Sequence, residues 1–197
     1  RVFRCIAHGW RSSVIRGQAL PFHECIEIGA HQCLPTVIAG ALRVASQPCD
    51  VEDVVGSALE QFGQRLDGRS VSIAIPENLP LIPLDFVLIV QVLVNIIDNA
   101  LKYSAADTPI QVNVDEISAE VQIRVADRGV GILPEDLAHI FDKFYRVQRP
   151  NNVTGTGLGL SIAKGIVEAH GGRIWAENRP GGGIAMVIAM PNTAPGS

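Results

Sequence analysis

The sequence has no excess of basic residues and no long uninterrupted apolar run. It contains 16 lysines and arginines against 20 aspartates and glutamates, which gives a formal net charge of −4. Nucleic-acid-binding proteins usually carry a basic face, so this balance predicts no nucleic-acid partner. The longest apolar run covers residues 86–97, where Gln91 and Asn95 interrupt it. It falls short of the roughly 18 residues that a membrane span needs.

The sequence also lacks a Cys-x-x-Cys pair, although it has four cysteines. His23-x-Cys25 and His31-x-Cys33 form a short repeat that could in principle hold zinc. Their spacing matches no zinc finger or ribbon, so we interpret the cysteines as reduced thiols of a cytosolic chain. The chain begins with Arg1 rather than methionine, and we interpret it as a fragment whose lack of an anchor does not bear on the parent protein.

The chain changes character along its length. Hydrophobic residues make up 47 % and charged residues 18 %, which predicts a folded core. Residues 1–38 show no sustained period of 3.6 or 2, and no fold is assigned to them. From about residue 50 the pattern becomes regular, with Asp50 as an expected helix N-cap and Gly68 as a stop.

Hydrophobic periodicity predicts alternating helices and hairpin-paired strands. Helices are expected over residues 51–66, 85–103 and 158–170, with a short one after Pro134. Strands are expected over 70–75, 110–114, 121–125, 173–177 and 184–190, and Pro76, Pro80 and Pro83 predict a loop. This order favours an α+β fold: a two-layer sandwich whose mixed, mostly antiparallel sheet is covered on one face by helices. Too few strands are separated by crossover helices for a parallel nucleotide-binding fold.

The long predicted helix carries polar residues on one face. Asn95, Asn99 and Lys102 are spaced so that they share that face of an otherwise apolar helix. An amide oxygen is a suitable ligand for Mg²⁺, and a lysine suits phosphate. The segment alone leaves open the alternative that the two amides simply cap neighbouring backbone groups.

Three further segments contain candidate binding residues. Residues 127–132, Asp-Arg-Gly-Val-Gly-Ile, follow a strand and place a carboxylate, which can accept a hydrogen bond from an amino group, beside two glycines. Residues 141–146 pair two phenylalanines with Lys143 and Arg146, which could reach phosphates. Residues 155–160, Gly-Thr-Gly-Leu-Gly-Leu, open a helix and present backbone N–H groups to an anion, yet they form no Walker loop.

Together and in this order, the four segments resemble the N, G1, F and G2 boxes of the histidine-kinase catalytic domain. That domain belongs to the superfamily of gyrase B, Hsp90 and MutL, whose ATP-binding fold is of the Bergerat type. The resemblance covers about residues 40–191. Within it, residues 85–95 and 166–178 are similar in particular to the KdpD-type potassium and turgor sensor kinases.

The resemblance implies a role for each motif position. Asn99 would coordinate Mg²⁺ with Asn95 nearby, Lys102 would contact phosphate, Tyr103 would pack near adenine, and Asp127 would accept a hydrogen bond from the adenine amino group. Three further positions would shape the base pocket: Gly129, Gly131 and Ile132. Phe141 and Phe144 would anchor the start of a mobile lid over 147–154, and Arg146 would meet phosphate. The backbone of the last segment would bind phosphate: Gly155, Thr156, Gly157, Leu158, Gly159 and Leu160.

The resemblance also implies a domain order and partners. Residues 50–191 would be the ATP-binding domain, 39–49 the end of a dimerisation region, and 192–197 a frayed tail; for 1–38 one interpretation is a truncated or non-native remnant of that region. The domain would supply Mg·ATP to a histidine on the dimerisation domain of the same kinase, which then passes phosphate to a response regulator. The parent would be a homodimer in the bacterial inner membrane with this domain in the cytoplasm.

No histidine in the sequence has the surroundings of a phosphate acceptor. The family places this histidine before an acidic residue, but His8 is followed by Gly9, and His23 and His31 fit no better. Autophosphorylation of this chain is therefore not expected. Two alternatives stay open: a nucleotide-binding module without kinase activity, and a serine kinase of the anti-sigma type.

Overall fold

The computed structural model describes residues 14–15, 18–19, 42–147 and 156–193. The His-x-Cys repeat, the three N-terminal histidines, Gly155 and all but the first residue of the expected lid lie outside these ranges. Within the described N-terminal residues, the two short strands β1 (Val14–Ile15) and β2 (Gln18–Ala19) pair antiparallel.

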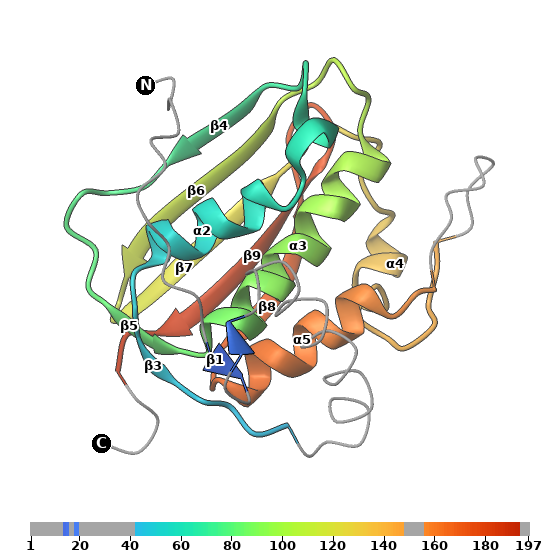
Figure 1. The fold of residues 1–197 in the computed structure, drawn as a ribbon. Coiled ribbons are helices and arrows are strands. Elements are labelled where there is room, and N and C mark those ends of the chain that lie inside the picture. Colours follow the sequence, from blue (N-terminus) through green and yellow to red (C-terminus); the bar gives the residue numbers. More distant parts are fainter. Residues whose placement is uncertain (1–13, 16–17, 20–41, 148–155, 194–197) are drawn as a thin grey trace.

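A five-stranded sheet forms one layer of the domain (Figure 1). The strands lie in the order β4-β6-β7-β9-β8, and only the pair β4 and β6 is parallel. This mixed, mostly antiparallel sheet confirms the predicted fold class. The strands are β4 (Val71–Ala74), β6 (Ile110–Ile117), β7 (Glu120–Ala126), β8 (Arg173–Asn178) and β9 (Ile184–Pro191).

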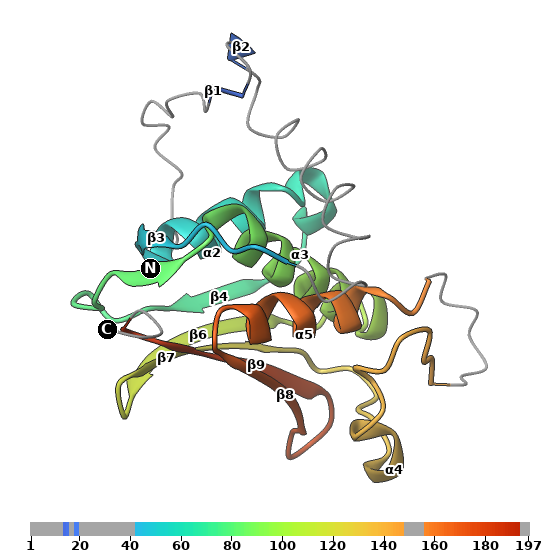
Figure 2. The same ribbon diagram turned by 90° about the horizontal axis from the view of Figure 1, so that it is seen from below.

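Three helices form the second layer and cover one face of the sheet (Figure 2). They are α2 (Val51–Glu60), α3 (Phe86–Tyr103) and α5 (Gly159–Ala169). The short helix α4 (Pro134–Leu137), expected after Pro134, lies apart from them. The core lies between the two layers, where apolar side chains of the helices meet the inward side chains of the strands.

Helix α3 is the central helix of the core. By length and composition it could cross a membrane, but here it packs against α2, α5 and the sheet. Its predicted apolar stripe is buried throughout, which confirms the periodicity argument: Ile89, Val92, Leu93, Ile96, Ile97 and Ala100. The opposite, polar side of its C-terminal half is thereby left for the site described below.

A buried histidine ties the start of α3 to the end of α5. The backbone N–H of Asp85, the N-cap of α3, donates to Nε2 of His170 over 2.9 Å. The other ring nitrogen, Nδ1, must therefore carry the proton that it donates to the Ile166 carbonyl at 2.7 Å. Burial lowers the pKa of His170 below its usual value. The structure thus uses His170, the C-cap of α5, as a neutral link between helices.

The predicted helix 51–66 is divided in two. Asp50 caps α2 as expected, because its side chain accepts from the Glu52 N–H at 2.8 Å. The α-helix ends at Glu60, and residues Gly63–Leu66 form the 3₁₀ helix η1 instead. Gly63 has a φ of +43°, which an α-helix cannot continue, so the single predicted helix was wrong at this point.

The predicted loop around Pro83 contains a short strand, which is a correction. Strand β5 (Ile82–Leu84) pairs antiparallel with β3 (Gln47–Cys49). Pro83 lies opposite Pro48, and alternate pairs of an antiparallel ladder exchange no N–H bonds, so two prolines can face each other there. Proline signals therefore hid a strand that is too short for its alternation to be visible in the sequence.

The hairpin of β6 and β7 is longer than predicted. Its turn falls between the two expected strands, and the two turn residues Ser118 and Ala119 have φ values of 51° and 64°. The ladder continues to the pair Ile117 and Glu120, where the apolar alternation has already ended. Backbone pairing in the exposed end of a hairpin does not require buried side chains. The apolar alternation therefore ended before the hydrogen-bonded ladder did, and the first strand was predicted too short.

Candidate nucleotide-binding site

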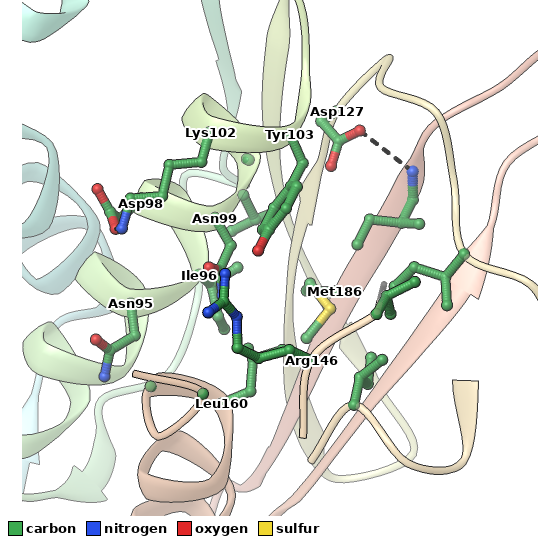
Figure 3. Close-up of a pocket in the computed structure, with 18 of the residues that line it drawn as sticks. Asn95, Ile96, Asp98, Asn99, Lys102, Tyr103, Asp127, Arg146, Leu160 and Met186 are labelled. Carbon is green, nitrogen blue, oxygen red and sulfur yellow. Dashed lines mark hydrogen bonds and ion pairs between the residues drawn. The ribbon is translucent and has the colours of Figure 1, made fainter. Parts of the chain in front are cut away.

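A pocket of about 260 Å³ opens between α3, the ends of β7 and β9, and the start of α5 (Figure 3). Its walls bring together segments that are far apart in the sequence. Twelve of the predicted site residues line it: Asn95, Asn99, Lys102, Tyr103, Asp127, Gly131, Ile132, Arg146, Thr156, Gly157, Gly159 and Leu160.

One end of the pocket is built around a buried carboxylate. Asp127 follows β7 directly and is only 4 % exposed. Its Oδ1 accepts from the Gly129 N–H at 2.7 Å and from the Ile184 N–H at 3.4 Å, the contact drawn dashed in Figure 3. Among the described residues none donates a hydrogen bond to Oδ2. Asp127 lines the pocket, so this oxygen is available to a ligand that donates a hydrogen bond.

The opposite end of the pocket is the polar face of α3. Asn95 and Asn99 are half-buried, and in the described part of the chain neither side chain makes a hydrogen bond. The described structure therefore gives no support to the alternative that these amides cap backbone groups. Arg146 points toward this face from the opposite wall (Figure 3).

Lys102 does not point freely into the pocket. Its Nζ lies 2.5 Å from Oδ2 of Asp98, and the Arg65 guanidinium lies 2.7 Å from Oδ1 of the same carboxylate. Burial pushes the pKa of Asp98 upward, but the hydrogen bonds from Lys102 and Arg65 outweigh it and hold that pKa below its usual value. Lysine, aspartate and arginine thus form one charged cluster at the rim.

The loops before and after residues 148–155 meet directly. The Phe144 N–H donates to the Gly157 carbonyl at 3.0 Å, and a Cβ on Gly157 would lie 2.9 Å from the Phe144 carbonyl carbon. Helix α5 then begins at Gly159 beside Asn95. Its N-cap Leu158 offers no side-chain hydrogen bond, so the first N–H groups of α5 remain available to an anion beside the α3 amides.

Four described residues with predicted ligand roles do not line the pocket. Gly129 lies behind Asp127, where a Cβ would come within 2.2 Å of the Tyr103 carbonyl oxygen. Phe141 packs against the core, and Leu158 acts through its backbone at the start of α5. Phe144, expected as an apolar anchor, is 69 % exposed with a φ of 64°, and it joins the site through its backbone only.

The pocket also has walls that motif reasoning missed. Five of them are apolar side chains of the predicted helix α3 and strands β7 and β9, and periodicity could have found these five once the strand ends were placed beside α3. They are Ile96, Ala100, Val125, Val130, Ile140, Ile184 and Met186, together with Asp98 and Tyr145; Val147, the first residue of the expected lid, lines the pocket as well. An apolar slot with a buried acceptor at one end, and amides and a helix N-terminus at the other, suits a planar base joined to phosphates.

The fold and the pocket define a nucleotide-binding domain of the α+β class. The chain belongs to the family described as "Histidine kinase-, DNA gyrase B-, and HSP90-like ATPase", whose sequence pattern matches residues 85–194. Its relatives are sensor histidine kinases, and the domain is the ATP-binding catalytic domain of that class.

Three similar proteins share sequence or fold with this chain. Sensor protein KdpD of Escherichia coli is 38 % identical over 158 residues, which cover 80 % of this chain and 18 % of KdpD. The structure of full-length ShkA in complex with AMPPNP has a TM-score of 0.68 and 26 % identity, and the match covers 86 % of this chain and 38 % of ShkA. Histidine kinase ThkA in complex with response regulator protein TrrA shares the fold, with a TM-score of 0.65, 22 % identity and coverage of 86 % and 49 %.

Proposed function

We propose that the pocket binds ATP with its adenine at Asp127 and its phosphates between α3 and the start of α5. The observation that carries this proposal is Oδ2 of Asp127, which accepts no hydrogen bond from the described residues although the residue is only 4 % exposed. The amino group of adenine can donate to it, whereas guanine has a carbonyl oxygen at the same ring position. ShkA was solved with the ATP analogue AMPPNP, which supports the same ligand class here.

The α3 amides fit a magnesium ion. Asn99 would hold Mg²⁺ through its side-chain oxygen, with Asn95 assisting, because both line the pocket and neither makes a hydrogen bond within the described residues. The ion would neutralise charge on the triphosphate. A neutral amide ligand adds no repulsion toward the phosphates, and Lys102 and Arg146 supply further positive charge at the rim.

The reaction we propose is phosphorylation of a histidine on the dimerisation domain of the same kinase, followed by relay to an aspartate of a response regulator. The relationship to KdpD supports the first step, although this chain spans only 18 % of the length of KdpD. The complex of ThkA with TrrA illustrates the second step in another protein that shares the fold. We extend the proposal to a homodimeric parent in the bacterial inner membrane, with this domain in the cytoplasm.

Asp127→Asn tests the nucleotide proposal most directly. The asparagine side chain has one oxygen and one NH₂ group in place of the two carboxylate oxygens. Its NH₂ group must face either the adenine amino group or the backbone N–H groups that Oδ1 accepts, and both arrangements place two donors together. ATP binding measured by calorimetry should therefore weaken at least about tenfold. Asp115→Asn is the matched control, because Asp115 is exposed on β6 away from the pocket. Equal ATP affinity of the Asp127 variant and the parent would refute the placement of adenine.

A transfer experiment separates the kinase from its alternatives. The chain is incubated with γ-labelled ATP, alone and with the dimerisation domain of a KdpD-type kinase. Acid-labile label on the added domain supports the histidine kinase, and acid-stable label on serine supports the anti-sigma type. Binding of ATP without transfer to any substrate supports an idle nucleotide module. Acid-labile label on this chain alone, lost in His8→Ala, would contradict the expected lack of an acceptor.

A further inference from the structure

The connection between β8 and β9 packs against the loop that forms the floor of the base end of the pocket. We call residues 127–132 the base loop and residues 178–183 the clamp turn. The two segments are about 50 residues apart in sequence, yet hydrogen bonds join them at several points along their length. Part of the base loop lines the pocket, whereas the clamp turn lies outside it.

The side chain of Asn178 pairs with the backbone of Ile132 in both directions. Its Oδ1 accepts from the Ile132 N–H at 2.9 Å, and its Nδ2 donates to the Ile132 carbonyl at 2.6 Å. The side-chain amide of Asn178 therefore binds both the N–H and the carbonyl of Ile132, as the backbone of a neighbouring strand would. Asn178 does not line the pocket itself, but Gly131 and Ile132 do.

Two arginines add hydrogen bonds between the clamp turn and the base loop. Arg179 donates to the backbone carbonyl of Asp127 at 2.8 Å and to Gln111 at 2.6 Å, and Arg128 reaches back to the Pro180 carbonyl at 3.0 Å. The Asp127 N–H also donates to the Ile184 carbonyl at 2.9 Å. The start of the base loop is therefore held by β9 and Arg179, and its end by Asn178.

Two glycines permit this close approach. A Cβ on Gly183 would lie 2.2 Å from the Asp127 carbonyl oxygen, and a Cβ on Gly131 would lie 3.1 Å from Oδ1 of Asn178. Both glycines have positive φ values, of 88° and 72°. The backbone is thus shaped on each side so that the clamp turn and the base loop fit together.

We propose that Asn178 is a positioning residue for base selection, which holds Ile132 so that adenine meets the free oxygen of Asp127. The inference rests on the proposed placement of adenine at Asp127. Without Asn178, Ile132 loses the partner of both its backbone groups, and the slot for the base is no longer fixed relative to the carboxylate. Binding of phosphates at α3 and α5 does not depend on this contact.

The test compares ATP with inosine triphosphate, which has a carbonyl in place of the amino group of adenine. Affinities of the full chain for both nucleotides are measured by calorimetry for the parent, Asn178→Ala and Asn192→Ala. Asn192 is the matched control, because its amide donates to Glu116 rather than to the base loop. We expect the ratio of ATP to inosine triphosphate affinity to fall at least about threefold in Asn178→Ala and to stay at the parent value in Asn192→Ala.

The ratio distinguishes positioning from general loss of structure. A variant that is only less stable binds both nucleotides less well and keeps the parent ratio, which would overturn the inference. A parent that does not prefer ATP would instead refute the adenine contact of Asp127. If Asn178→Ala does not fold, Asn178→Asp replaces it, since it retains the acceptor for the Ile132 N–H but cannot donate to the carbonyl. An unchanged ratio in that variant would overturn the inference equally.

Discussion

The two ends of the pocket differ in how their polar groups are held. At the base end, Oδ1 of Asp127 accepts two backbone N–H groups, and Asn178 and Arg179 fix the backbone around it. At the phosphate end, Asn95 and Asn99 make no side-chain hydrogen bonds within the described residues, and Lys102 is bound to Asp98. The first end is arranged before a ligand arrives, whereas the second has groups that still need partners.

The difference has a physical reason. A planar base is recognised by shape and one or two hydrogen bonds, so its slot gains from being rigid. A triphosphate with Mg²⁺ carries a large charge, and amides, a lysine and helix N–H groups can supply compensation only when it is bound. Substitutions that disturb the backbone contacts at the base end should therefore change stability as well as binding, whereas those at the phosphate end should change ligand binding and leave the fold intact.

Gly183→Ala should have the largest effect and should act on the base end as structure. A Cβ would come within 2.2 Å of the Asp127 carbonyl oxygen at a φ of 88°. We expect the free energy of unfolding in urea to fall by about 3 kcal/mol or more, with loss of ATP binding. Gly68→Ala is the control: its φ is 78° with nothing within 4 Å, so a loss of about 1 kcal/mol is expected. Equal losses in the two variants would refute the close packing of the clamp turn against the base loop.

Asn99→Ala should act on binding and leave the fold intact. Removing a metal ligand should reduce the gain in ATP affinity on adding Mg²⁺ by about tenfold or more, as measured by calorimetry with Mg²⁺ and with EDTA. Asn113→Ala on β6 is the control, because Val112 and Val114 beside it point into the core and Asn113 points to the other face of the sheet. The same dependence on Mg²⁺ in the Asn99 variant and the parent would show that another group holds the metal.

The sequence predicted local periodicity better than long-range contacts. The apolar stripe of α3 and the strands around Asp127 were predicted correctly, because burial imposes a period that local sequence displays. The pairing of Asn178 with Ile132 was not predicted, since it joins positions 46 residues apart and the motif that contains Ile132 does not indicate a partner at Asn178. Such a contact depends on how the clamp turn packs against the base loop, and local sequence patterns do not specify that packing.

Other misses have local causes. The exposed Phe144 shows that an apolar residue in a motif can act through its backbone, which composition cannot reveal. The ion pair of Lys102 with Asp98 is one turn of helix away and could have been predicted from its spacing. Strand β5 was hidden by Pro83, since proline signals a loop unless its partner strand is known.

The helices that carry the phosphate end should lose stability in acid through His170. Burial lowers the folded pKa, so the contribution of His170 is complete above the unfolded pKa of 6.5 and is lost as the pH falls below it. Urea unfolding should show a loss of stability between pH 7 and 5.5 from this residue, with a slope of at most about 1.4 kcal/mol per pH unit. His170→Gln removes the titration and should flatten the profile in that window, even though its stability at pH 7 is lower. A profile as steep as that of the parent would assign the loss to other groups.

Asp98→Asn gives the smallest expected effect, and it tests whether Asp98 competes with the phosphates of the ligand for Lys102. Lys102 must leave Asp98, at 2.5 Å, before it can neutralise a phosphate, and the carboxylate itself faces the site. Since partly exposed ion pairs contribute up to about 1 kcal/mol, we expect ATP affinity to rise about threefold at low salt. The gain should shrink at high salt, where the pair is already screened.

The control for this variant is Glu168→Gln on α5. It removes a helical ion pair of the same spacing, between Lys164 and Glu168 at 3.9 Å, from positions that do not line the pocket. ATP affinity should not change there. If Asp98→Asn weakens ATP binding instead, Asp98 directs Lys102 toward the ligand rather than competing for it. The phosphate end would then be arranged in advance, as the base end is, and the contrast between the two ends would not hold.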